Sequence, residues 1–398
     1  MNEKIELLSE RYYPHVVQLR HWFHEHAELS WKEYQTSEQI VRELEDIGVE
    51  YEAHYGNETN VAAWIKGTGP GDPSRVIMLR ADMDALPVQE PESHEPRSMN
   101  PGVMHACGHD GHTANLLGVV RILNDLKDSF AGTIKFCFEA AEENVGGAFD
   151  FMDKGFLDDV EAAYGLHLYG GVKEGKVGIR AGGMMSASDV IHLNIHGVSG
   201  HSSQPHLAID PIVIAAQFIT DAQAVISRKL PPYEIGVLGL STIHAGTMFN
   251  IIPDTVEITG SIRCFSEESR ALIHKSMEGI LDGLTKAYGA TYELWYTNEM
   301  YAVINDEKLV EGALKSIESV VGRDGIDPMK QPWMGSESFA YYAKKAPLCF
   351  FTVGIDAGDA LPVNHNLHHN QNFCWHDEVL LTALRTLSQV ALDHMTRP

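Results

Sequence analysis

Short apolar runs alternate with helical segments through the first half of the chain, and this alternation constrains the fold more than any other feature. Strands are predicted at residues 76–79, 133–138 and 162–168, and helices at about 113–127 and 147–154. Strands that alternate with helices predict a mainly parallel sheet covered by helices on both faces. In such a sheet the polar residues that follow each strand gather at one edge, where ligands bind.

The middle of the chain has the pattern of a different kind of domain. Residues 189–198 alternate between apolar and polar side chains, as in a strand with one buried face. Asp210 before Pro211 predicts a helix start, and a helix opened by Ser266 should end at Gly289. Further strands are predicted at 234–245, 254–264 and 291–296. The resulting order β-α-β-β-α-β is that of a ferredoxin-like sandwich.

The α/β pattern then returns, with a helix predicted at 306–321, a strand at 347–353 and a C-terminal helix from His376. We therefore expect a discontinuous α/β domain of residues 1–183 and 298–398, interrupted by an α+β domain of residues 184–297. A chain of 398 residues is also long enough for two domains.

Composition excludes several classes of partner. The chain has 55 acidic and 30 basic side chains and a formal net charge of −25, so we expect neither nucleic acid nor anionic membrane as its partner. The sequence contains no run of 18 apolar residues, so no membrane span is predicted. The first residues lack the pattern of a secretory signal, and five scattered cysteines argue against a disulfide framework. Both observations favour the cytoplasm.

The densest group of potential metal ligands lies in residues 105–112, His-Ala-Cys-Gly-His-Asp-Gly-His. Cys107 and His109 are two residues apart, so an irregular loop can direct both side chains at one cation. The alternative is a loop that merely precedes a helix, with its histidines at the helix start. A structural zinc site would need further Cys or His pairs at similar spacing, and none follows.

Three more signals follow predicted strands or lie near the end of the chain. Glu142 and Glu143 come after the strand at 133–138, and two adjacent carboxylates repel one another unless a cation lies between them. His167 lies near the end of the next strand, and His368 and His369 are adjacent near the C-terminus. Each signal alone is also compatible with an exposed loop or a core histidine, but together they predict a metal site.

Other polar residues allow two interpretations each. Asp82 and Asp84 resemble a metal-binding Asp-x-Asp pair, but we expect them to orient a metal ligand instead. His201 lies in a polar segment that is either a surface turn or part of a site. Arg263 lies on the polar face of a predicted strand, where it is either solvated or available to bind a carboxylate through two hydrogen bonds.

Over nearly its whole length the sequence resembles the amidohydrolase branch of a metallopeptidase family, which includes aminoacylases, hippurate hydrolases and auxin-conjugate (indoleacetyl-amino-acid) hydrolases. The segments that carry the resemblance are Leu79–Pro87, His105–His112, Ala141–Glu143, Gly165–His167, Asn250–Pro253 with Arg263, and Met334–Glu337. The resemblance implies a zinc-exopeptidase-like α/β catalytic domain with an inserted ferredoxin-like lid. The implied reaction is metal-dependent hydrolysis of N-acyl amino acids or related small amides.

The resemblance also implies a role for individual residues. The implied ligands of two divalent cations, Mn²⁺ or Zn²⁺, are Cys107, His109, Glu143, His167 and His369. The family ends in His-x-x-x-Phe, which selects His369 over His368 when counted back from Phe373. Glu142 takes the position of the general base. His201, Asn250 and Arg263 match lid residues that contact the carbonyl and carboxylate of the substrate. A homodimer through the lid is implied, in which His201 reaches the metal site of the partner.

The sequence departs from the family pattern at three places, none of them a proposed ligand. Ala27 replaces a proline, Glu139 lies where a glutamine is usual, and Ser338 replaces an aspartate. We expect the charge of Glu139 to disfavour an anionic acyl group. Two alternatives to acyl-amino-acid hydrolysis stay open: a dipeptidase or aminopeptidase with the same metals, and a catalytically silent small-molecule binding protein.

Overall fold

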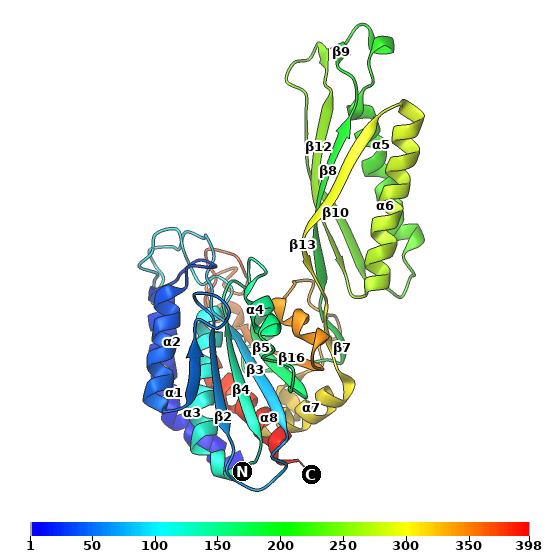
Figure 1. Ribbon diagram of the computed structural model, residues 1–398. Coiled ribbons are helices and arrows are strands. Elements are labelled where there is room, and N and C mark those ends of the chain that lie inside the picture. Colours follow the sequence, from blue (N-terminus) through cyan, green and yellow to red (C-terminus); the bar gives the residue numbers. More distant parts are fainter. Residues whose placement is uncertain (1, 398) are drawn as a thin grey trace. The chain divides into compact units, whose positions relative to one another are not determined.

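The computed structural model describes residues 2–397, and the chain divides into two compact units (Figure 1). The larger unit consists of Met1–Met184, Ile304–Pro332 and Ser338–Pro398. The smaller unit consists of Met185–Val303 and Trp333–Glu337. The segment Trp333–Glu337 was expected in the α/β domain. It belongs to the smaller unit because the Ser186 backbone N–H donates to the Gly335 carbonyl and Met185 forms a β-bridge with Trp333.

A mainly parallel sheet forms the centre of the larger unit, which confirms the predicted fold class. Its strand order is β1-β2-β4-β3-β5-β16-β14-β7. The strands are β1 (Glu50–Ala53), β2 (Val61–Lys66), β3 (Val76–Asp82), β4 (Thr133–Glu139), β5 (Ala162–Lys173), β7 (Gly182–Met185), β14 (Val303–Asn305) and β16 (Leu348–Asp356), with β6 (Val177–Gly178) and β15 (Ile326–Asp327) paired off this path. Strands β3, β4, β5 and β16 run parallel, whereas β1 and β2 are antiparallel.

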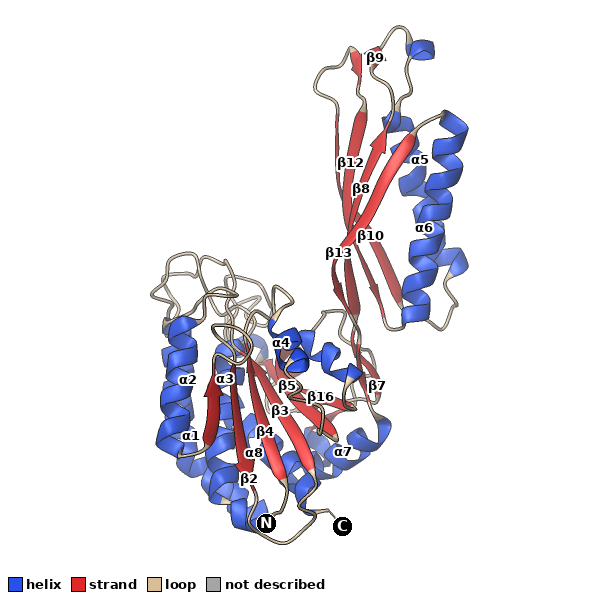
Figure 2. Cartoon of the chain, viewed as in Figure 1, coloured by secondary structure: helices blue, strands red, loops and turns tan. Residues whose placement is uncertain are grey.

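Helices pack against this sheet and against one another (Figure 2). They are α1 (Asn2–Glu25), α2 (Tyr34–Ile47), α3 (His109–Asp125), α4 (Gly147–Asp153), α7 (Glu307–Val321) and α8 (Val379–Thr396). The helix predicted from residue 113 begins earlier, at His109, so His109 and His112 lie in its first turn. Within residues 2–397, no helix is long and apolar enough to cross a bilayer.

The smaller unit is a four-stranded antiparallel sheet with two helices on one side (Figure 2). Its elements are β8 (Ala187–His196), α5 (Pro211–Ala224), β10 (Gly236–Ala245), β12 (Thr255–Cys264), α6 (Glu267–Tyr288) and β13 (Thr291–Met300), in the sheet order β10-β12-β8-β13. This is the predicted ferredoxin-like chain order. The side chains of Asp210 and Ser266 cap α5 and α6, as expected, and Gly289 ends α6 in a left-handed conformation. A separate two-stranded antiparallel sheet pairs β9 (Gly200–His201) with β11 (Ile251–Ile252).

Candidate metal centre

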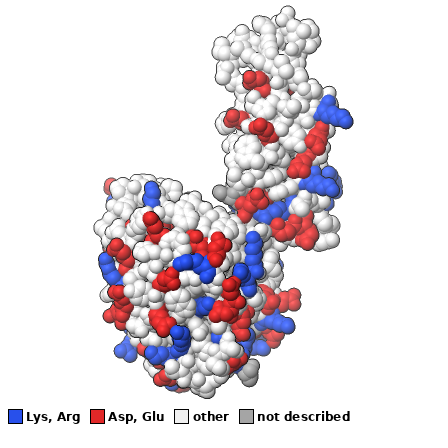
Figure 3. All heavy atoms as spheres, in the orientation of Figure 1, with Lys and Arg blue, Asp and Glu red and all other residues white. Residues whose placement is uncertain are grey.

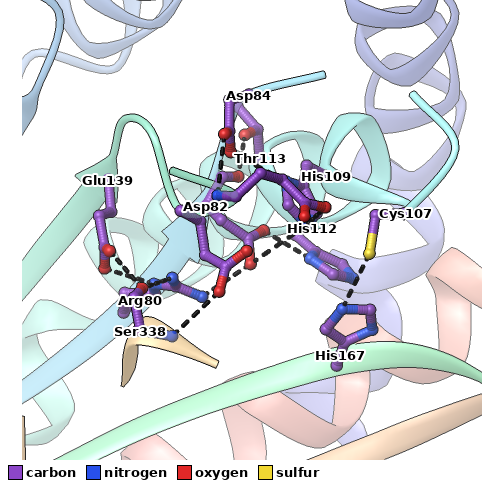
Figure 4. Close-up of polar contacts among 12 residues, drawn as sticks. Arg80, Asp82, Asp84, Cys107, His109, His112, Thr113, Glu139, His167 and Ser338 are labelled. Atoms are coloured by element: carbon purple, nitrogen blue, oxygen red, sulfur yellow. Dashed lines mark hydrogen bonds and ion pairs between the residues drawn. The ribbon is translucent and has the colours of Figure 1, made fainter. Parts of the chain in front are cut away.

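Polar residues from four segments of the larger unit meet beyond the ends of β3 and β4 (Figure 4). Asp82 is the last residue of β3, and it lies opposite Glu139 at the end of β4. Glu142 and Glu143 follow β4 closely in the chain, and His167 comes from β5. His109 is the first residue of α3, and Cys107 lies just before that helix. The parallel arrangement therefore brings the chemistry-bearing segments to one edge of the sheet.

The predicted ligands form three overlapping groups of side chains whose ligand atoms lie within 4.8 Å of one another. The groups are Cys107 with His109 and His167, Cys107 with Glu143 and His369, and His109 with Glu142 and Glu143. Cys107 Sγ lies 3.6 Å from His167 Nε2, and Glu143 Oε1 lies 3.3 Å from His369 Nε2. A fourth group joins His109 to Asp82 and His112. Since Cys107 and Glu143 each belong to two groups and His109 to three, the arrangement is compatible with two neighbouring cations.

His368 and His369 occupy different environments. His369 adopts a left-handed backbone conformation with φ 60°, and its half-exposed side chain faces Glu143. His368 is partly buried, and its Nε2 atom accepts a hydrogen bond from the Gly170 N–H at 3.3 Å. Burial, followed by the neighbouring histidines, lowers the pKa of His368 to about 3. The geometry therefore favours His369 as the ligand, and His368 as a neutral side chain that packs against Tyr169 and Phe373.

The chemistry of the donor set fits divalent cations. His109 Nε2 and Glu143 Oε1 are buried, make no hydrogen bond within residues 2–397, and lie 3.9 Å apart. Burial lowers the pKa of His109, but the charges of Asp82, Asp84 and Glu143 outweigh it and bring the pKa to about 10. Burial and the charges of Glu143 and Glu142 raise the pKa of Cys107. The cluster thus requires positive charge, and its sulfur, nitrogen and oxygen donors suit zinc-like cations.

Asp82 and Asp84 orient the histidines, as we expected for this pair. Asp84 Oδ1 lies 3.2 Å from His109 Nδ1, and Asp84 Oδ2 accepts hydrogen bonds from the Glu143 N–H and the Ser30 hydroxyl. Asp82 Oδ1 lies 2.6 Å from His112 Nδ1, and His112 Nε2 accepts the Leu168 N–H at 2.9 Å. Carboxylates that fix a histidine ring in this way also make it a stronger ligand.

Glu142 is held by the backbone of a distant segment. The Ser338 N–H, at the start of a 3₁₀ segment (Ser338–Lys344), donates to Glu142 Oε1 at 3.0 Å. The Glu142 side chain is close to the ligand atoms of His109 and Glu143. Unlike Glu143, it belongs to only one of the ligand groups. Glu142 therefore lies beside the candidate ligand atoms, with one carboxylate oxygen fixed by the backbone.

The expectation for Glu139 is corrected by its contacts. Glu139 is fully buried, and its Oε2 atom accepts hydrogen bonds from Arg80 Nε and the Tyr342 hydroxyl, both at 2.7 Å. Its other oxygen accepts the Ser338 hydroxyl, and Arg80 also binds Asp82 (Figure 4). Because Arg80 neutralises this carboxylate within the core, Glu139 does not present its charge to an acyl group.

The smaller unit places the three predicted substrate contacts at opposite ends of its sheet. His201 pairs with Ile251 in the two-stranded β9–β11 sheet, and the Asn250 carbonyl accepts a hydrogen bond from the Ser202 N–H. His201 and Asn250 are therefore neighbours. Arg263 lies near the far end of β12. From Thr255, where β12 begins, to Arg263 a strand extends about 26 Å at about 3.3 Å per residue. Within one smaller unit these residues are not brought together.

His201 and Arg263 are nevertheless both available to a ligand. The Ser203 N–H donates to His201 Nδ1 at 3.1 Å, so the neutral ring carries its proton on the exposed Nε2 side. Arg263 Nη1 donates to the Ser336 hydroxyl at 3.0 Å, and no carboxylate within residues 2–397 forms an ion pair with it. His201 thus presents its Nε2 atom to the surface, and Arg263 forms no ion pair among the described residues.

Sequence comparisons place the chain among known proteins. Residues 78–393 match the model of peptidase family M20/M25/M40. An N-acyl-L-amino acid amidohydrolase of Geobacillus stearothermophilus is 42% identical over 76% of this chain and 81% of its own length. A thermostable carboxypeptidase of Saccharolobus solfataricus is 35% identical over 92% and 91%.

A solved structure extends the match to the whole fold. A dinuclear metal-binding peptidase of the M20 family from Bacillus subtilis has a TM-score of 0.83 and 30% identity, with 98% of this chain and 99% of that chain covered. The match therefore includes both units and the segments that carry the polar cluster. On these grounds the chain belongs to peptidase family M20/M25/M40.

Proposed function

We propose that this protein uses two divalent cations to hydrolyse the amide bond of N-acyl amino acids, releasing a carboxylic acid and an amino acid. The observation that carries the proposal is the set of overlapping ligand groups beside Glu142. The similarity to an N-acyl-L-amino acid amidohydrolase supports the substrate class. Family membership and the dinuclear site of the Bacillus subtilis relative support the number of cations.

Five residues would hold the cations: Cys107, His109, Glu143, His167 and His369. When bound, the cations would act as Lewis acids that polarise the amide carbonyl and make a water molecule nucleophilic near neutral pH. The mixture of one thiolate, three imidazoles and one carboxylate is compatible with Zn²⁺ or Mn²⁺, and we propose one of these two ions.

Glu142 would move the proton that hydrolysis requires. Its carboxylate takes a proton from the attacking water and delivers it to the nitrogen of the leaving amino acid. The Ser338 N–H holds Oε1 in place, so the carboxylate needs no reorganisation before it accepts the proton. Proton transfer by a positioned group of this kind is worth about two to four powers of ten in rate.

Arg263 would bind the carboxylate of the amino-acid portion. The guanidinium has no ion-pair partner within residues 2–397, and only the Ser336 hydroxyl fixes it. A bidentate hydrogen bond to a carboxylate would orient the substrate as well as attract it. This assignment predicts a preference for free amino-acid carboxylates over amides or esters.

His201 would donate a hydrogen bond to the oxyanion in the site of a second copy of the chain. An N-acyl amino acid extends only about 7 Å, as two residues do, so one smaller unit cannot present both His201 and Arg263 to one substrate. A partner subunit that supplies His201 and Asn250 removes this conflict. The proton on His201 Nε2 suits the donor role.

The proposed dimer would form through the smaller unit. Strands β10 and β13 are the edges of its sheet, and unpaired edges bind other strands readily. Between Glu234 and Asp254, a segment that contains β10, the sequence has no Lys, Arg, Asp or Glu. In Figure 3 the end of the smaller unit around β9 likewise shows neither acidic nor basic side chains. An uncharged edge in a chain of net charge −25 favours a second copy over repulsion.

A carboxypeptidase or dipeptidase with the same cations is the second candidate, because a thermostable carboxypeptidase is among the relatives. Turnover of N-acetyl and N-benzoyl amino acids against dipeptides and N-blocked peptides separates the two activities. We expect the acyl amino acids to give the larger kcat/KM. Preference for dipeptides would replace the proposal, and absence of turnover with metal bound would favour a silent binding protein. Location in the cytoplasm stays a prediction, which cell fractionation would test.

A further inference from the structure

Glu142 follows a strained turn at Ala140 and Ala141, whose backbone N–H groups both donate to side chains from elsewhere in the chain. Ala141 has φ 53°, a left-handed conformation that a residue with a side chain rarely adopts. The Ala140 N–H donates to Asn60 Oδ1 at 2.8 Å, and the Ala141 N–H donates to Glu33 Oε1 at 2.8 Å. A turn of this kind keeps its shape only when its surroundings over-determine it.

Glu33 is unusual among these partners because it is a fully buried carboxylate without a basic partner. Its side chain is 0% exposed, and besides the Ala141 N–H it accepts the Thr59 hydroxyl at 3.1 Å. Burial, followed by the charge of Asp84, raises the pKa of Glu33 to about 7. Burial of a carboxylate costs free energy unless hydrogen bonds replace its lost hydration. Glu33 receives such bonds from the Ala141 N–H, which belongs to the turn, and from the Thr59 hydroxyl.

Glu33 belongs to a loop of residues 28–33 that also contacts the segments bearing the candidate metal ligands. Ser30 donates to Asp84, which in turn contacts His109 and accepts the Glu143 N–H. The Ala85 N–H donates to the Glu28 carbonyl, which ties the loop to the chain after β3. The loop at 28–33 therefore supports both sides of the cluster, and Glu33 is the residue that reaches the segment bearing Glu142.

We propose that Glu33 is a positioning residue for the reaction: its buried carboxyl group fixes the Ala141 backbone and thereby aims Glu142 at the attacking water. The inference rests on the proposed role of Glu142 as general base. Glu33 belongs to none of the ligand groups, so its loss should misplace the base without emptying the metal site. Misplacement of a reacting group by about 1 Å costs on the order of a hundredfold in rate.

Two substitutions separate the hydrogen bond from the volume of the side chain. Glu33→Gln keeps a carbonyl oxygen for the Ala141 N–H, and we expect kcat within about threefold of wild type. Glu33→Met fills a similar volume without an acceptor, and we expect kcat to fall about 10- to 100-fold with unchanged KM and two metal ions per chain. Equal kcat in the two variants, or metal loss in Glu33→Met, would overturn the proposal.

Stability needs its own control, because Glu33→Met could unfold the larger unit. Glu90→Gln alters another buried carboxylate of this unit, one that contacts His24, His94 and Ser98, and it should keep wild-type kcat. Thr59→Val removes the hydroxyl donor to Glu33, and we expect a two- to fivefold fall in kcat at unchanged KM. A Thr59→Val enzyme with wild-type kcat would count against the proposal even where Glu33→Met cannot be purified.

A double-mutant cycle tests whether Glu33 acts through Glu142. In the Glu142→Gln background, Glu33→Met should leave the residual turnover unchanged, because no base remains to be positioned. A further 10-fold loss in the double variant would show an independent role and overturn the proposal. If Glu142→Gln itself keeps wild-type activity, the general-base assignment falls and the positioning role falls with it. If Glu142→Gln is inactive but Glu33→Met is fully active, only the positioning role falls.

Discussion

Three of the five proposed ligands of the larger unit are buried, whereas His201, a proposed substrate contact of the smaller unit, is exposed. Cys107, His109 and His167 are 7%, 1% and 2% exposed, and polar partners fix the rings of both histidines. His201 is exposed, and Phe249 beside Asn250 is 93% exposed. The larger unit also contains buried ion pairs such as Arg80–Glu139. In the smaller unit, β10 and the two-stranded β9–β11 sheet contain no Lys, Arg, Asp or Glu.

The larger unit therefore contains a largely preformed ligand cluster, whereas the smaller unit presents exposed residues that need a second surface to form a site. A cluster that is buried and oriented before any ligand arrives can bind cations without help from other elements. Exposed residues on the uncharged β9–β11 sheet, such as His201, acquire a defined environment only when another surface covers them. We therefore predict that changes in the larger unit abolish chemistry within one chain, whereas changes in the smaller unit can be compensated by a second chain.

The largest effects are expected from the adjacent carboxylates of the larger unit. Glu142→Gln keeps size and polarity but cannot take a proton, so kcat should fall by about 10²- to 10⁴-fold while both cations stay bound. Glu143→Gln should lose metal as well as activity. Elemental analysis beside steady-state kinetics measures both. Equal metal loss in the two variants would end the proposed division of roles.

His201 gives the sharpest contrast between the units. His201→Ala and Glu142→Gln should each be nearly inactive alone, but a mixed dimer has one site with an intact Glu142 and a His201 from the other chain. After subunit exchange at equal concentrations, about a quarter of wild-type activity should return. Verified mixed dimers without activity would show that His201 acts within its own chain or not at all.

Arg263 should change selectivity more than rate. Arg263→Ala removes the cation proposed to bind the amino-acid carboxylate, so kcat/KM for N-acetyl amino acids should fall about 10- to 100-fold. The matching N-acetyl amino-acid amides lack that charge and should change less than about threefold. Comparable losses on both substrate types would assign Arg263 to the structure of the smaller unit instead.

The smallest effects concern stability and its dependence on pH. Hydrogen bonds from His24 and His94, against the opposing effect of burial, lower the pKa of Glu90 to about 2. A depressed carboxyl pKa stabilises the fold above the unfolded value of about 4.3, and this contribution is lost as pH falls toward about 2. Glu90→Gln should therefore lower the free energy of unfolding by about 1–3 kcal/mol at pH 7, and by less at pH 3.5.

The matched change in the smaller unit is Glu293→Gln, which affects a largely exposed pair with His196. Its effect should stay within about 0.5 kcal/mol at both pH values. Urea unfolding at pH 7 and 3.5 measures both variants. A Glu90→Gln effect that does not shrink with acidity would show that the Glu90 cluster stabilises the unit by packing alone.

Much of the cluster was predictable because its ligands lie close together in the sequence or follow strands with a clear apolar pattern. Cys107 and His109 share one segment, and Glu142 and Glu143 are adjacent. The start of α3 was not predictable, because its N-cap is Gly108 at φ 93° and no side chain caps the helix. Without Ser, Thr, Asp or Asn at this position the usual start signal is absent.

Residues that act through distant contacts gave no local signal. Glu33 and Ser30 bind Ala141 and Asp84, partners that lie far along the chain. Glu139 carries a charge that its neighbours in sequence do not explain, since its partner Arg80 comes from another strand. Periodicity and spacing in the sequence identify which segments meet at the edge of the sheet. They do not identify which side chains from other parts of the chain form hydrogen bonds with those segments.

A titration of metal-stripped enzyme with Mn²⁺ or Zn²⁺, followed by both bound metal and hydrolysis of an N-acetyl amino acid, tests the central claim most directly. We predict two ions per chain and turnover that appears only as the ions bind, with Cys107→Ser binding less metal and losing activity because Cys107 belongs to two ligand groups. Full turnover by the metal-free protein, or two bound ions and normal turnover in Cys107→Ser, would contradict the account.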